Sequence, residues 1–477
     1  MTAEKTDEYD LIVLGGGPVG ENVADRAVQG GLTAIIVESE LVGGECSYWA
    51  CMPSKALLRS AQALRAAQHV AGAKEAVTGT LDVRAVFDRR DGFTSNWSDD
   101  GQVKWLDSAG IDLARGHGRL SGEREVTVTD ADGGTRVLRA RHAVAVSTGS
   151  DAVIPPIDGL REASPWTSRE ATSAEELPES LAVIGGGVVA VEMATAYAAL
   201  GSTVTLIARS GLLGSMEPFA GERVAAGLKE LGVDVRTDTG TTSVTRTDGG
   251  VEIVLDDGST ITAAEVLAAT GRSPRSGDIG LDAVGLEPGR WIEVDDTMRV
   301  PGSDWLYAVG DVNGRVLLTH QGKYQGRAAG DVIAARAKGD DVDDAPWGRH
   351  VATADHAGAP QVTFSIPEVA SVGLTEAAAR EAGHEVAVVD YDLGGVAGAS
   401  LYEDGFDGQA RLVIDADRDV ILGATFVGPE VAELVQTATV AIVGEVPLSR
   451  LWHAVPAYPT VSEVWLRLLE GYGRQSA

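Results

Sequence analysis

The sequence predicts an α/β protein with two Rossmann-like dinucleotide-binding domains and a C-terminal α+β domain. A glycine-rich motif follows a short apolar strand at residues 15–20, and a closely similar motif recurs at residues 185–190. From residue 360 onward the chain changes to short strands followed by a helix, which favours a separate α+β domain. A chain of 477 residues is long enough for about two to four domains of ordinary size.

The first dinucleotide-binding unit is predicted at the N-terminus. An apolar strand at 9–14 leads into the motif Gly-Gly-Gly-Pro-Val-Gly at 15–20, which opens a helix through Ala27, and a second strand at 33–37 ends at Glu38. This order of strand, glycine motif, helix, strand and acid is the context in which such a motif binds a dinucleotide. The glycines let the backbone approach a pyrophosphate at the helix N-terminus, and the acid can bind ribose hydroxyls.

A helix and then β-structure are predicted between the two glycine motifs. Residues 56–78 are rich in Ala, Leu, Gln and Arg, which indicates a helix whose apolar face packs rather than reacts. Strands at 126–129 and 137–146 flank Asp132-Gly133-Gly134, a turn typical of a β-hairpin. Pro155-Pro156 indicates a linker into the second unit.

The second unit repeats the first, with one difference that concerns the nucleotide. Its strand and glycine motif occupy 181–190, and a further strand at 203–207 ends in Ala208-Arg209 rather than in an acid. A guanidinium suits a 2′-phosphate, so Arg209 favours NADPH over NADH; the alternative is a solvated surface arginine. Two dinucleotide sites in one chain are the arrangement that moves electrons between a nicotinamide and a second cofactor.

The third predicted domain comprises strands at 361–364, 385–391, 410–414 and 420–427 and a helix at 429–443. Alternating strands with a late helix indicate an α+β domain.

The composition excludes several classes of function. There are 39 Lys and Arg residues against 70 Asp and Glu, a formal net charge of −31, so we expect neither nucleic acid nor a membrane as a partner. No apolar run is long enough to span a bilayer and the acidic N-terminus lacks a signal-peptide pattern, so we expect a cytoplasmic protein. In that compartment a disulfide is more often catalytic or redox-sensing than structural. No metal site is predicted.

Cys46 and Cys51 are the only cysteines, and they lie in the segment 43–55, Gly-Gly-Glu-Cys-Ser-Tyr-Trp-Ala-Cys-Met-Pro-Ser-Lys. In an ideal helix, residues five apart have Cα atoms about 8.7 Å apart, which exceeds the ~7 Å limit for a disulfide. A bond between them therefore requires an irregular backbone, and the flanking glycines and Pro53 predict a loop that enters a helix. A helix N-terminus favours the reactive thiolate. Two buried, inert thiols are the alternative.

These motifs together resemble the FAD-dependent pyridine nucleotide-disulfide oxidoreductases, the family of dihydrolipoamide dehydrogenase, glutathione reductase and mercuric reductase. Segment 43–55 is similar to the family's G-G-x-C-x-x-x-x-C-x-P-[ST]-K redox-active disulfide. Residues 147–150 and 269–274 resemble its two crossover strands, 309–311 its second FAD motif, and 363–375 the opening of its dimerisation domain. The similarity covers nearly the full length, and it favours a redox pair over inert thiols.

The resemblance assigns roles to individual residues. Cys46 would be the interchange thiol that attacks the substrate, and Cys51 the charge-transfer thiol beside the flavin. Lys55, near flavin N5, would pair with Glu192, because a buried charge needs a partner. The residues expected to bind FAD or the nicotinamide nucleotide are Gly15, Gly17, Pro18, Gly20, Glu38, Gly44, Lys55, Gly118, Thr148, Gly149, Gly185, Gly187, Glu192, Arg209, Gly271, Gly310, Asp311 and Thr319.

The resemblance also implies domain boundaries. Residues 1–155 would form the first part of the FAD-binding domain, 156–277 the NAD(P)H-binding domain, 278–345 the second part of the FAD-binding domain, and 346–477 the dimerisation domain.

The C-terminal motif departs from the family pattern. Where the family has H-P-T-x-x-E, this chain has Tyr458-Pro459-Thr460-Val461-Ser462-Glu463. A phenol with an ordinary pKa of ~10 is a poorer proton shuttle at neutral pH than an imidazole at ~6.5. Mercuric reductase resembles this chain in having Tyr there, but its further C-terminal cysteine pair has no counterpart here. His453 is an alternative base. The competing interpretation is that His453 only packs in the fold or faces solvent.

We therefore expect a homodimeric flavoprotein that passes electrons from NADPH through FAD to the Cys46–Cys51 disulfide and on to a disulfide or thiol-type acceptor. It would be dihydrolipoamide dehydrogenase-like or mercuric reductase-like, with NADH as the alternative donor and with Tyr458 and Glu463 supplied by the partner subunit. One alternative is a reductase of quinones or other acceptors at the flavin. Another is a lipoamide dehydrogenase-like subunit that assembles into a larger complex. The spacer at 47–50 is expected to reshape the substrate mouth.

Overall fold

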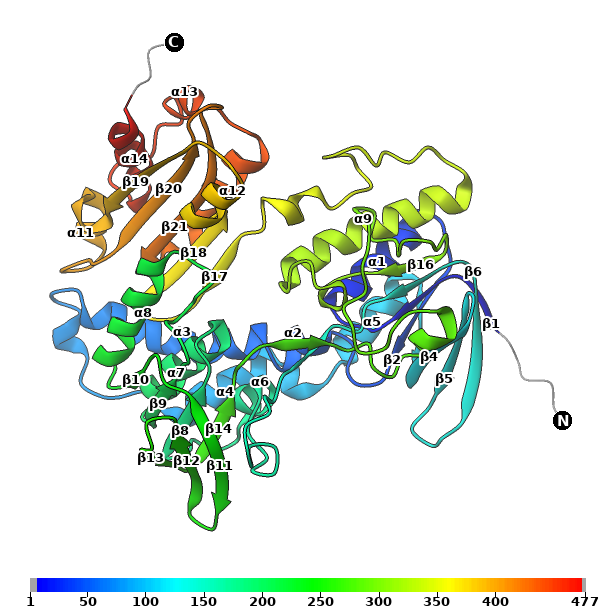
Figure 1. The fold of residues 1–477 in the computed structure, drawn as a ribbon, viewed down its shortest axis with the longest axis horizontal. Coiled ribbons are helices and arrows are strands. Elements are labelled where there is room, and N and C mark those ends of the chain that lie inside the picture. Colours follow the sequence, from blue (N-terminus) through cyan, green and yellow to red (C-terminus); the bar gives the residue numbers. More distant parts are fainter. Residues whose placement is uncertain (1–6, 474–477) are drawn as a thin grey trace. The chain divides into compact units, whose positions relative to one another are not determined.

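The protein is described by a computed structural model in which residues 7–473 are placed (Figure 1). The chain forms two compact units. Unit 1 comprises residues 1–53, 91–152 and 272–355, and unit 2 comprises residues 54–90, 153–271 and 356–477.

Unit 1 is built on a seven-stranded sheet in the order β3-β2-β1-β6-β5-β4, with β16 also paired to β6. Strands β3, β2, β1, β6 and β16 are parallel, whereas β4 and β5 pair antiparallel, so the predicted Rossmann unit and hairpin are confirmed. The strands are β1 (Asp7–Leu14), β2 (Ala34–Glu38), β3 (Ile111–Arg115), β4 (His117–Gly122), β5 (Glu125–Thr129), β6 (Thr135–Val146) and β16 (Leu306–Ala308).

Helix α1 (Pro18–Gln29) follows β1, and α9 (Thr319–Lys338) packs along it. Glycines of α9 make this close approach possible: a Cβ on Gly322 would lie 2.6 Å from Val19 Cγ2, and one on Gly330 would lie 2.6 Å from the main-chain oxygen of Val23. Any larger residue there would push the helices apart. The packing holds the start of α9 beside the glycine loop that precedes α1.

Residues 153–271 of unit 2 contain a four-stranded parallel sheet in the order β10-β9-β8-β14 and an antiparallel meander β11-β12-β13. The predicted repeat of strand, glycine motif, helix and strand is confirmed. The elements are β8 (Ser180–Ile184), α7 (Val188–Leu200), β9 (Thr203–Ile207), α8 (Pro218–Glu230), β10 (Asp234–Arg236), β11 (Thr241–Thr247), β12 (Gly250–Leu255), β13 (Thr260–Ala263) and β14 (Glu265–Ala268).

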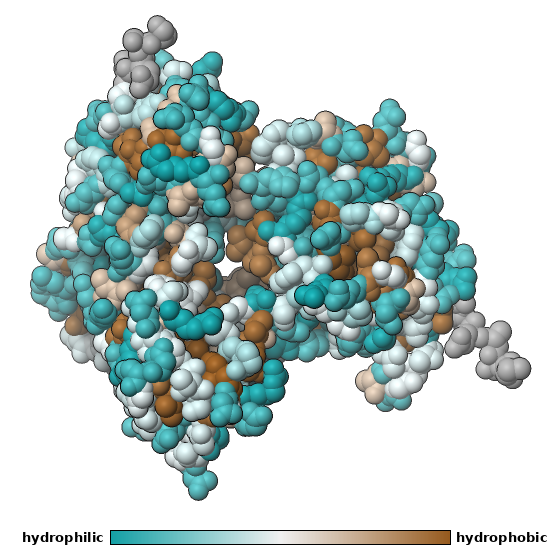
Figure 2. Space-filling view, viewed as in Figure 1, coloured by the Kyte–Doolittle hydropathy of each residue, from teal (hydrophilic) through white to brown (hydrophobic). Residues whose placement is uncertain are grey.

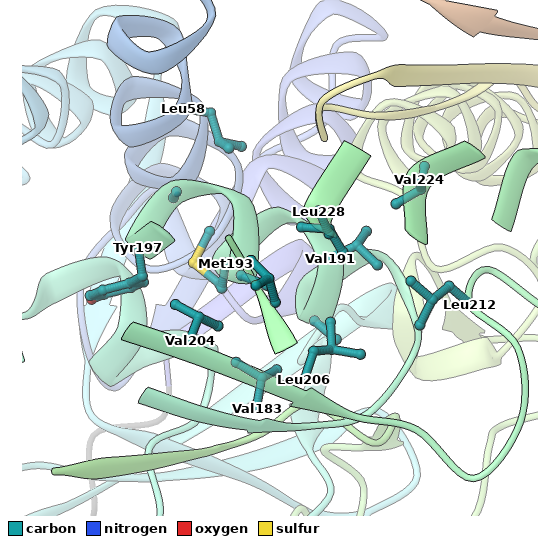
Figure 3. Packing of buried hydrophobic residues seen from close by; sticks show 14 of the residues in the cluster. Leu58, Val183, Val191, Met193, Tyr197, Val204, Leu206, Leu212, Val224 and Leu228 are labelled. Carbon is teal, nitrogen blue, oxygen red and sulfur yellow. The ribbon is translucent and has the colours of Figure 1, made fainter. Parts of the chain in front are cut away.

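Helix α3 (Cys51–Gln68) contributes to the core of this part of unit 2. Leu58 of α3 lies in one buried cluster with Met193 and Tyr197 of α7 and with Val204 of β9 (Figure 3). These side chains expose 1% or less of their surface. The cluster therefore fixes α3 against α7, which brings their polar residues within reach of one another.

The C-terminal part of unit 2 is a five-stranded antiparallel sheet in the order β17-β18-β21-β20-β19, as expected for an α+β domain. Its strands are β17 (Gln361–Thr363), β18 (Glu368–Gly373), β19 (Val386–Asp392), β20 (Gln409–Asp415) and β21 (Val420–Gly428). The helices α12 (Val435–Val443) and α14 (Val464–Tyr472) bury their apolar faces against the sheet.

Several boundaries differ from the predictions. The helix expected at 56–78 ends at Gln68, because Gly72 adopts a left-handed backbone with φ of +90° that a helix cannot contain. The helix expected at 429–443 begins as a 3₁₀ turn at 431–434 before α12. Among residues 7–473, no helix combines the length and apolar character needed to cross a membrane. The remaining α-helices are α2 (Gly44–Tyr48), α4 (Val83–Phe93), α5 (Asp100–Ala109), α6 (Ser168–Ser173), α10 (Glu376–Glu381), α11 (Ala397–Tyr402) and α13 (Leu448–Leu451).

Candidate redox site

The two cysteines lie on either side of a break between two helices. Cys46 lies within α2, whose C-cap residue Trp49 has a φ of −136° and a ψ of 5°, and Cys51 is the first residue of α3. The backbone between them is therefore irregular, as the spacing requires for a bond between the two sulfurs. Both cysteine side chains are half-buried.

Tyr48, in the spacer between the cysteines, anchors α2. Its side chain is 1% exposed, its hydroxyl donates to the main-chain oxygen of Val42 at 3.0 Å, and Trp97 Nε1 donates to the main-chain oxygen of Tyr48 at 3.1 Å. Burial raises the pKa of Tyr48 to about 12, with Asp99 adding to the effect. Tyr48 thus holds the helix in place, whereas Ser47, Trp49 and Ala50 of the spacer are half-buried.

Cys51 contacts a residue 268 positions away. Its Sγ lies 3.3 Å from Oγ1 of Thr319, the first residue of α9. Sequence reasoning placed both residues beside the flavin, and the structure brings them together. A hydroxyl at this distance can donate to a thiolate and stabilise it.

The glycine loop before α1 forms a cradle lined by main chain. A Cβ on Gly20 would lie 2.0 Å from the oxygen of Gly15, and one on Gly44 would lie 2.8 Å from Cα of Gly17. The Gly16 N–H donates to Glu38 Oε2 at 2.7 Å, which fixes the acid at the end of β2. A Cβ on Gly17 would meet no atom closer than 4.0 Å, so the loop is open there. These features fit the pyrophosphate and ribose of FAD at the α1 N-terminus.

A charged network joins the crossover strands to the second FAD motif. Ser150, in β7 (Ser150–Ala152), donates from Oγ to Asp311 Oδ2 at 2.6 Å. Arg272, in β15 (Arg272–Pro274), donates from Nε to Ser150 Oγ at 2.6 Å and lies 3.9 Å from Asp311 Oδ2. Thr148 Oγ1 donates to the main-chain oxygen of Arg275 at 2.6 Å. Sequence reasoning missed Arg272, although its place directly after the Thr-Gly of the crossover strand is a usable signal.

Glu45 places a carboxylate directly before Cys46. Arg275 lies within ion-pair distance of Glu45, at 3.4 Å, and also pairs with Asp151. The guanidinium therefore balances the negative charge beside the first cysteine.

Glu21, in the first turn of α1, is a buried carboxyl that sequence reasoning did not single out. Burial raises its pKa to about 7, with Lys323 opposing the shift. Its Oε1 has no hydrogen-bond partner among residues 7–473. A group that ionises near neutral pH thus lies in the helix that carries the glycine loop.

Unit 2 holds the predicted pair of Lys55 and Glu192. Lys55 Nζ lies 2.7 Å from Glu192 Oε2, and the carboxylate is almost fully buried on α7. The other carboxylate oxygen accepts a hydrogen bond from the Phe364 N–H at 2.9 Å. The Phe364 ring centroid lies 5.0 Å from Lys55 Nζ.

The second glycine loop shows the same open form. Gly185 has φ of +139°, and its Cβ would lie 2.2 Å from the oxygen of Ala269, whereas a Cβ on Gly187 would meet nothing within 4 Å. Gly271, with φ of +136°, faces equally open space. Arg209 is exposed at the end of β9, with no ion-pair partner in the described part of the chain. Its guanidinium is thus available to a bound anion.

Gly118 and Gly149 are explained by packing and conformation. A Cβ on Gly118 would lie 2.8 Å from Leu14 Cδ2 and 2.9 Å from Val37 Cγ1, so only glycine fits against β1 and β2. Gly149 has φ of +77°, a left-handed backbone that favours glycine. Gly310 also has a positive φ of 81° and lies against Val19.

The C-terminal motif presents one exposed and one buried residue. Tyr458 is 76% exposed, and Glu463 is 6% exposed, with Oε2 lacking a hydrogen-bond partner among the described residues. His453 is also exposed. Figure 2 shows apolar side chains at the surface of the C-terminal sheet domain, where Leu401 and Val455 are 72% and 83% exposed.

Comparisons with known proteins agree with these observations. Residues 9–326 match the family described as pyridine nucleotide-disulphide oxidoreductase, and residues 359–468 match the dimerisation domain of that family. A dihydrolipoyl dehydrogenase of Synechocystis is 33% identical, with 98% of each chain covered. A mercuric reductase of Acidithiobacillus ferrooxidans is 32% identical over 96% of this chain and 81% of that protein.

Solved structures show the same fold. The HOCl-induced flavoprotein disulfide reductase RclA of Escherichia coli superposes with a TM-score of 0.83 at 22% identity, over 97% of this chain and 99% of that one. LpdA of Mycobacterium tuberculosis gives a TM-score of 0.82 at 23% identity, with the same coverage.

Proposed function

This chain belongs to the pyridine nucleotide-disulphide oxidoreductase family, and we propose that it is an NADPH-preferring member whose redox pair is Cys46 and Cys51. Its relatives establish the general activity: electrons pass from NAD(P)H through FAD to a redox-active disulfide and on to a disulfide or thiol-type acceptor.

The contact between Cys51 and Thr319 is the observation that carries the assignment. It ties the first residue of α3 to the first residue of α9, and α9 follows the second FAD motif and packs on α1. One cysteine therefore lies beside the expected flavin site, and the other precedes the helix break. This arrangement supports Cys51 as the charge-transfer thiol and Cys46 as the interchange thiol.

Residues at the start of α1 and at the end of β2 would bind FAD. Gly15, Gly17 and Gly20 would cradle the FAD pyrophosphate, and Glu38 would bind its ribose. When bound, FAD supplies a two-electron carrier between the nicotinamide and the disulfide. Cys46 and Cys51 would then pass two electrons and two protons to an acceptor disulfide. In this step the two thiols are oxidised to a disulfide and the acceptor is reduced to two thiols.

NADPH preference is supported by the exposed Arg209. The strand β9 ends without the carboxylate that would hydrogen-bond a 2′-hydroxyl and would repel a 2′-phosphate. The exposed guanidinium is suited to bind a phosphate through two parallel hydrogen bonds.

A homodimer is supported by the dimerisation domain at 359–468 and by its exposed apolar residues. We propose that the partner subunit supplies Tyr458 and Glu463 to the disulfide-reducing site. The buried, unpartnered oxygen of Glu463 needs a donor, and an interface can supply one.

Reduction of a quinone at the flavin is the second candidate function. The exposed Tyr458 in place of an imidazole favours it, because quinone reduction needs no acid at the interchange thiol.

Thiol counting tests the assignment of the redox pair. Anaerobic NADPH added to the oxidised, FAD-loaded wild type should release two thiols per chain that react with a chromogenic disulfide reagent. Cys46→Ser and Cys51→Ser should each show one reactive thiol before and after NADPH. A wild type that releases no thiols would overturn the assignment.

A further inference from the structure

The carboxylate of Glu192 is held by two partners. One oxygen binds the Lys55 ammonium at 2.7 Å, and the other accepts the Phe364 N–H at 2.9 Å. Because Glu192 is 3% exposed, its charge depends on these partners for the solvation that water does not provide. The main chain at Phe364 therefore fixes the orientation of the carboxylate.

The ammonium of Lys55 is also held by two partners, and Phe364 is again one of them. Its ring centroid lies 5.0 Å from Nζ, within the range in which the negative face of an aromatic ring attracts a cation. The lysine side chain is 35% exposed, so its long stem would otherwise sample several rotamers. Ring and carboxylate together restrict the ammonium to one position.

Phe364 is itself firmly placed. It directly follows β17, the strand that pairs with β18 through Thr363 and Val369. Its side chain packs against the same buried cluster that includes Leu58 of α3 and Met193 of α7. Phe364 thus connects the sheet domain to α3 and α7, the helices that carry Lys55 and Glu192.

We propose that Phe364 is the positioning residue of the Lys55–Glu192 pair, acting through its N–H on the carboxylate and through its ring on the ammonium. The inference rests on the proposed function, in which Lys55 lies beside the flavin. If Phe364 has this role, its ring determines how firmly the Lys55 ammonium is held near the flavin. The ring then also affects the rate at which the flavin is reduced.

Two ring variants separate the cation contact from packing. Phe364→Leu keeps the N–H and most of the apolar volume but removes the aromatic face, whereas Phe364→Tyr keeps the face. Phe219→Leu is the matched control, since the Phe219 ring lies 5.3 Å from the Arg411 guanidinium elsewhere in unit 2. FAD content and thermal melts verify folding, and Phe364→Met serves as a second non-aromatic variant if Phe364→Leu fails to retain FAD.

Two readouts are measured: the flavin midpoint potential and the rate of anaerobic flavin reduction by NADPH. Phe364→Leu should lower the potential, because an ammonium that is held less firmly stabilises the negative charge of the reduced flavin less. It should slow flavin reduction by about 2- to 30-fold, the range expected for a lost cation–π contact. Phe364→Tyr and Phe219→Leu should match the wild type.

The outcomes distinguish two failures. If Lys55→Met leaves the flavin midpoint potential unchanged, Lys55 does not lie beside the flavin and the proposed site fails. If Lys55→Met lowers the potential but Phe364→Leu does not, only the role of Phe364 is overturned. A Phe364→Tyr variant as impaired as Phe364→Leu, or an equal effect of Phe219→Leu, would also overturn that role.

Discussion

Cys51 Sγ lies 3.3 Å from Thr319 Oγ1, so the second cysteine of the redox motif meets the first residue of the helix that follows the second FAD motif. Cys51→Ser should abolish the long-wavelength charge-transfer absorbance of the two-electron-reduced enzyme. Persistence of that band in an anaerobic titration would mean that the roles of the two sulfurs are reversed.

Thr319→Val should destabilise the Cys51 thiolate, because it removes a hydroxyl that can donate a hydrogen bond to the sulfur. A hydrogen bond to a charged group contributes about 1.5–3 kcal/mol, so the pH at which the charge-transfer band appears should rise. The pH titration of the band in the reduced enzyme measures this. Thr319→Ser keeps a hydroxyl and should restore the wild-type titration; an unaltered titration in Thr319→Val would exclude the hydroxyl as a donor.

Arg209→Ala should reduce the preference for NADPH. Loss of a guanidinium from a phosphate should lower kcat/KM for NADPH by about 10-fold or more and leave that for NADH nearly unchanged. The exposed Arg161→Ala, in the same predicted domain, is the control for a general change of charge. A wild type that prefers NADH would contradict the assignment of Arg209 before any variant is made.

Tyr458→His tests the departure in the C-terminal motif. An imidazole near its working pH contributes about 10²- to 10⁴-fold in general acid–base catalysis, so this variant should increase disulfide turnover at neutral pH and leave quinone turnover unchanged. Tyr458→Phe should decrease disulfide turnover. If all three proteins reduce disulfides equally, position 458 takes no part in proton transfer.

Glu368 should make the free energy of unfolding depend on pH. Its side chain is buried, which raises its pKa from 4.5 to about 7. The folded state therefore binds this proton more tightly than the unfolded state, and stability falls as pH rises from about 4.5 to about 7. Glu368→Gln should remove this dependence, so its stability relative to wild type should increase by up to about 3 kcal/mol over that range.

Urea unfolding of the holoenzyme at about pH 5 and about pH 8 measures the difference for Glu368→Gln. Glu433→Gln removes an exposed charge from the 3₁₀ turn nearby and should leave the pH dependence largely intact. Equal pH dependence in wild type and Glu368→Gln would show that folding does not raise the pKa of Glu368.

The local patterns of the sequence were sufficient for the two units of strand, glycine motif and helix, for the hairpin and for the break between the cysteines, but they did not predict the helices α4 and α5. The glycine motifs, the hairpin turn and the cysteine spacing each depend on neighbouring residues, and the corresponding features are present in β1–α1, β5–β6 and α2–α3. Gly118 shows the limit of the same reasoning, because the reason for a glycine there is the approach of Leu14 and Val37, which no local pattern reveals.

Contacts between distant segments could not be predicted from local patterns. Phe364 lies 172 residues from Glu192, and Arg272 lies 122 residues from Ser150. These contacts depend on how α3, α7 and the crossover strands pack. The family resemblance was sufficient to predict the Lys55–Glu192 pair, whereas the contacts of Phe364 and Arg272 were found only in the structure.

The passage of electrons through Cys46 is tested most directly by steady-state turnover. Purified, FAD-loaded wild type and Cys46→Ser would be compared anaerobically with NADPH and with lipoamide, glutathione disulfide and a quinone. We predict that the wild type reduces at least one disulfide and that Cys46→Ser loses that activity while its FAD content is unchanged. Quinone turnover that dominates in the wild type and survives in Cys46→Ser, with no disulfide reduced, would contradict the assignment and identify a flavin-level reductase on this fold.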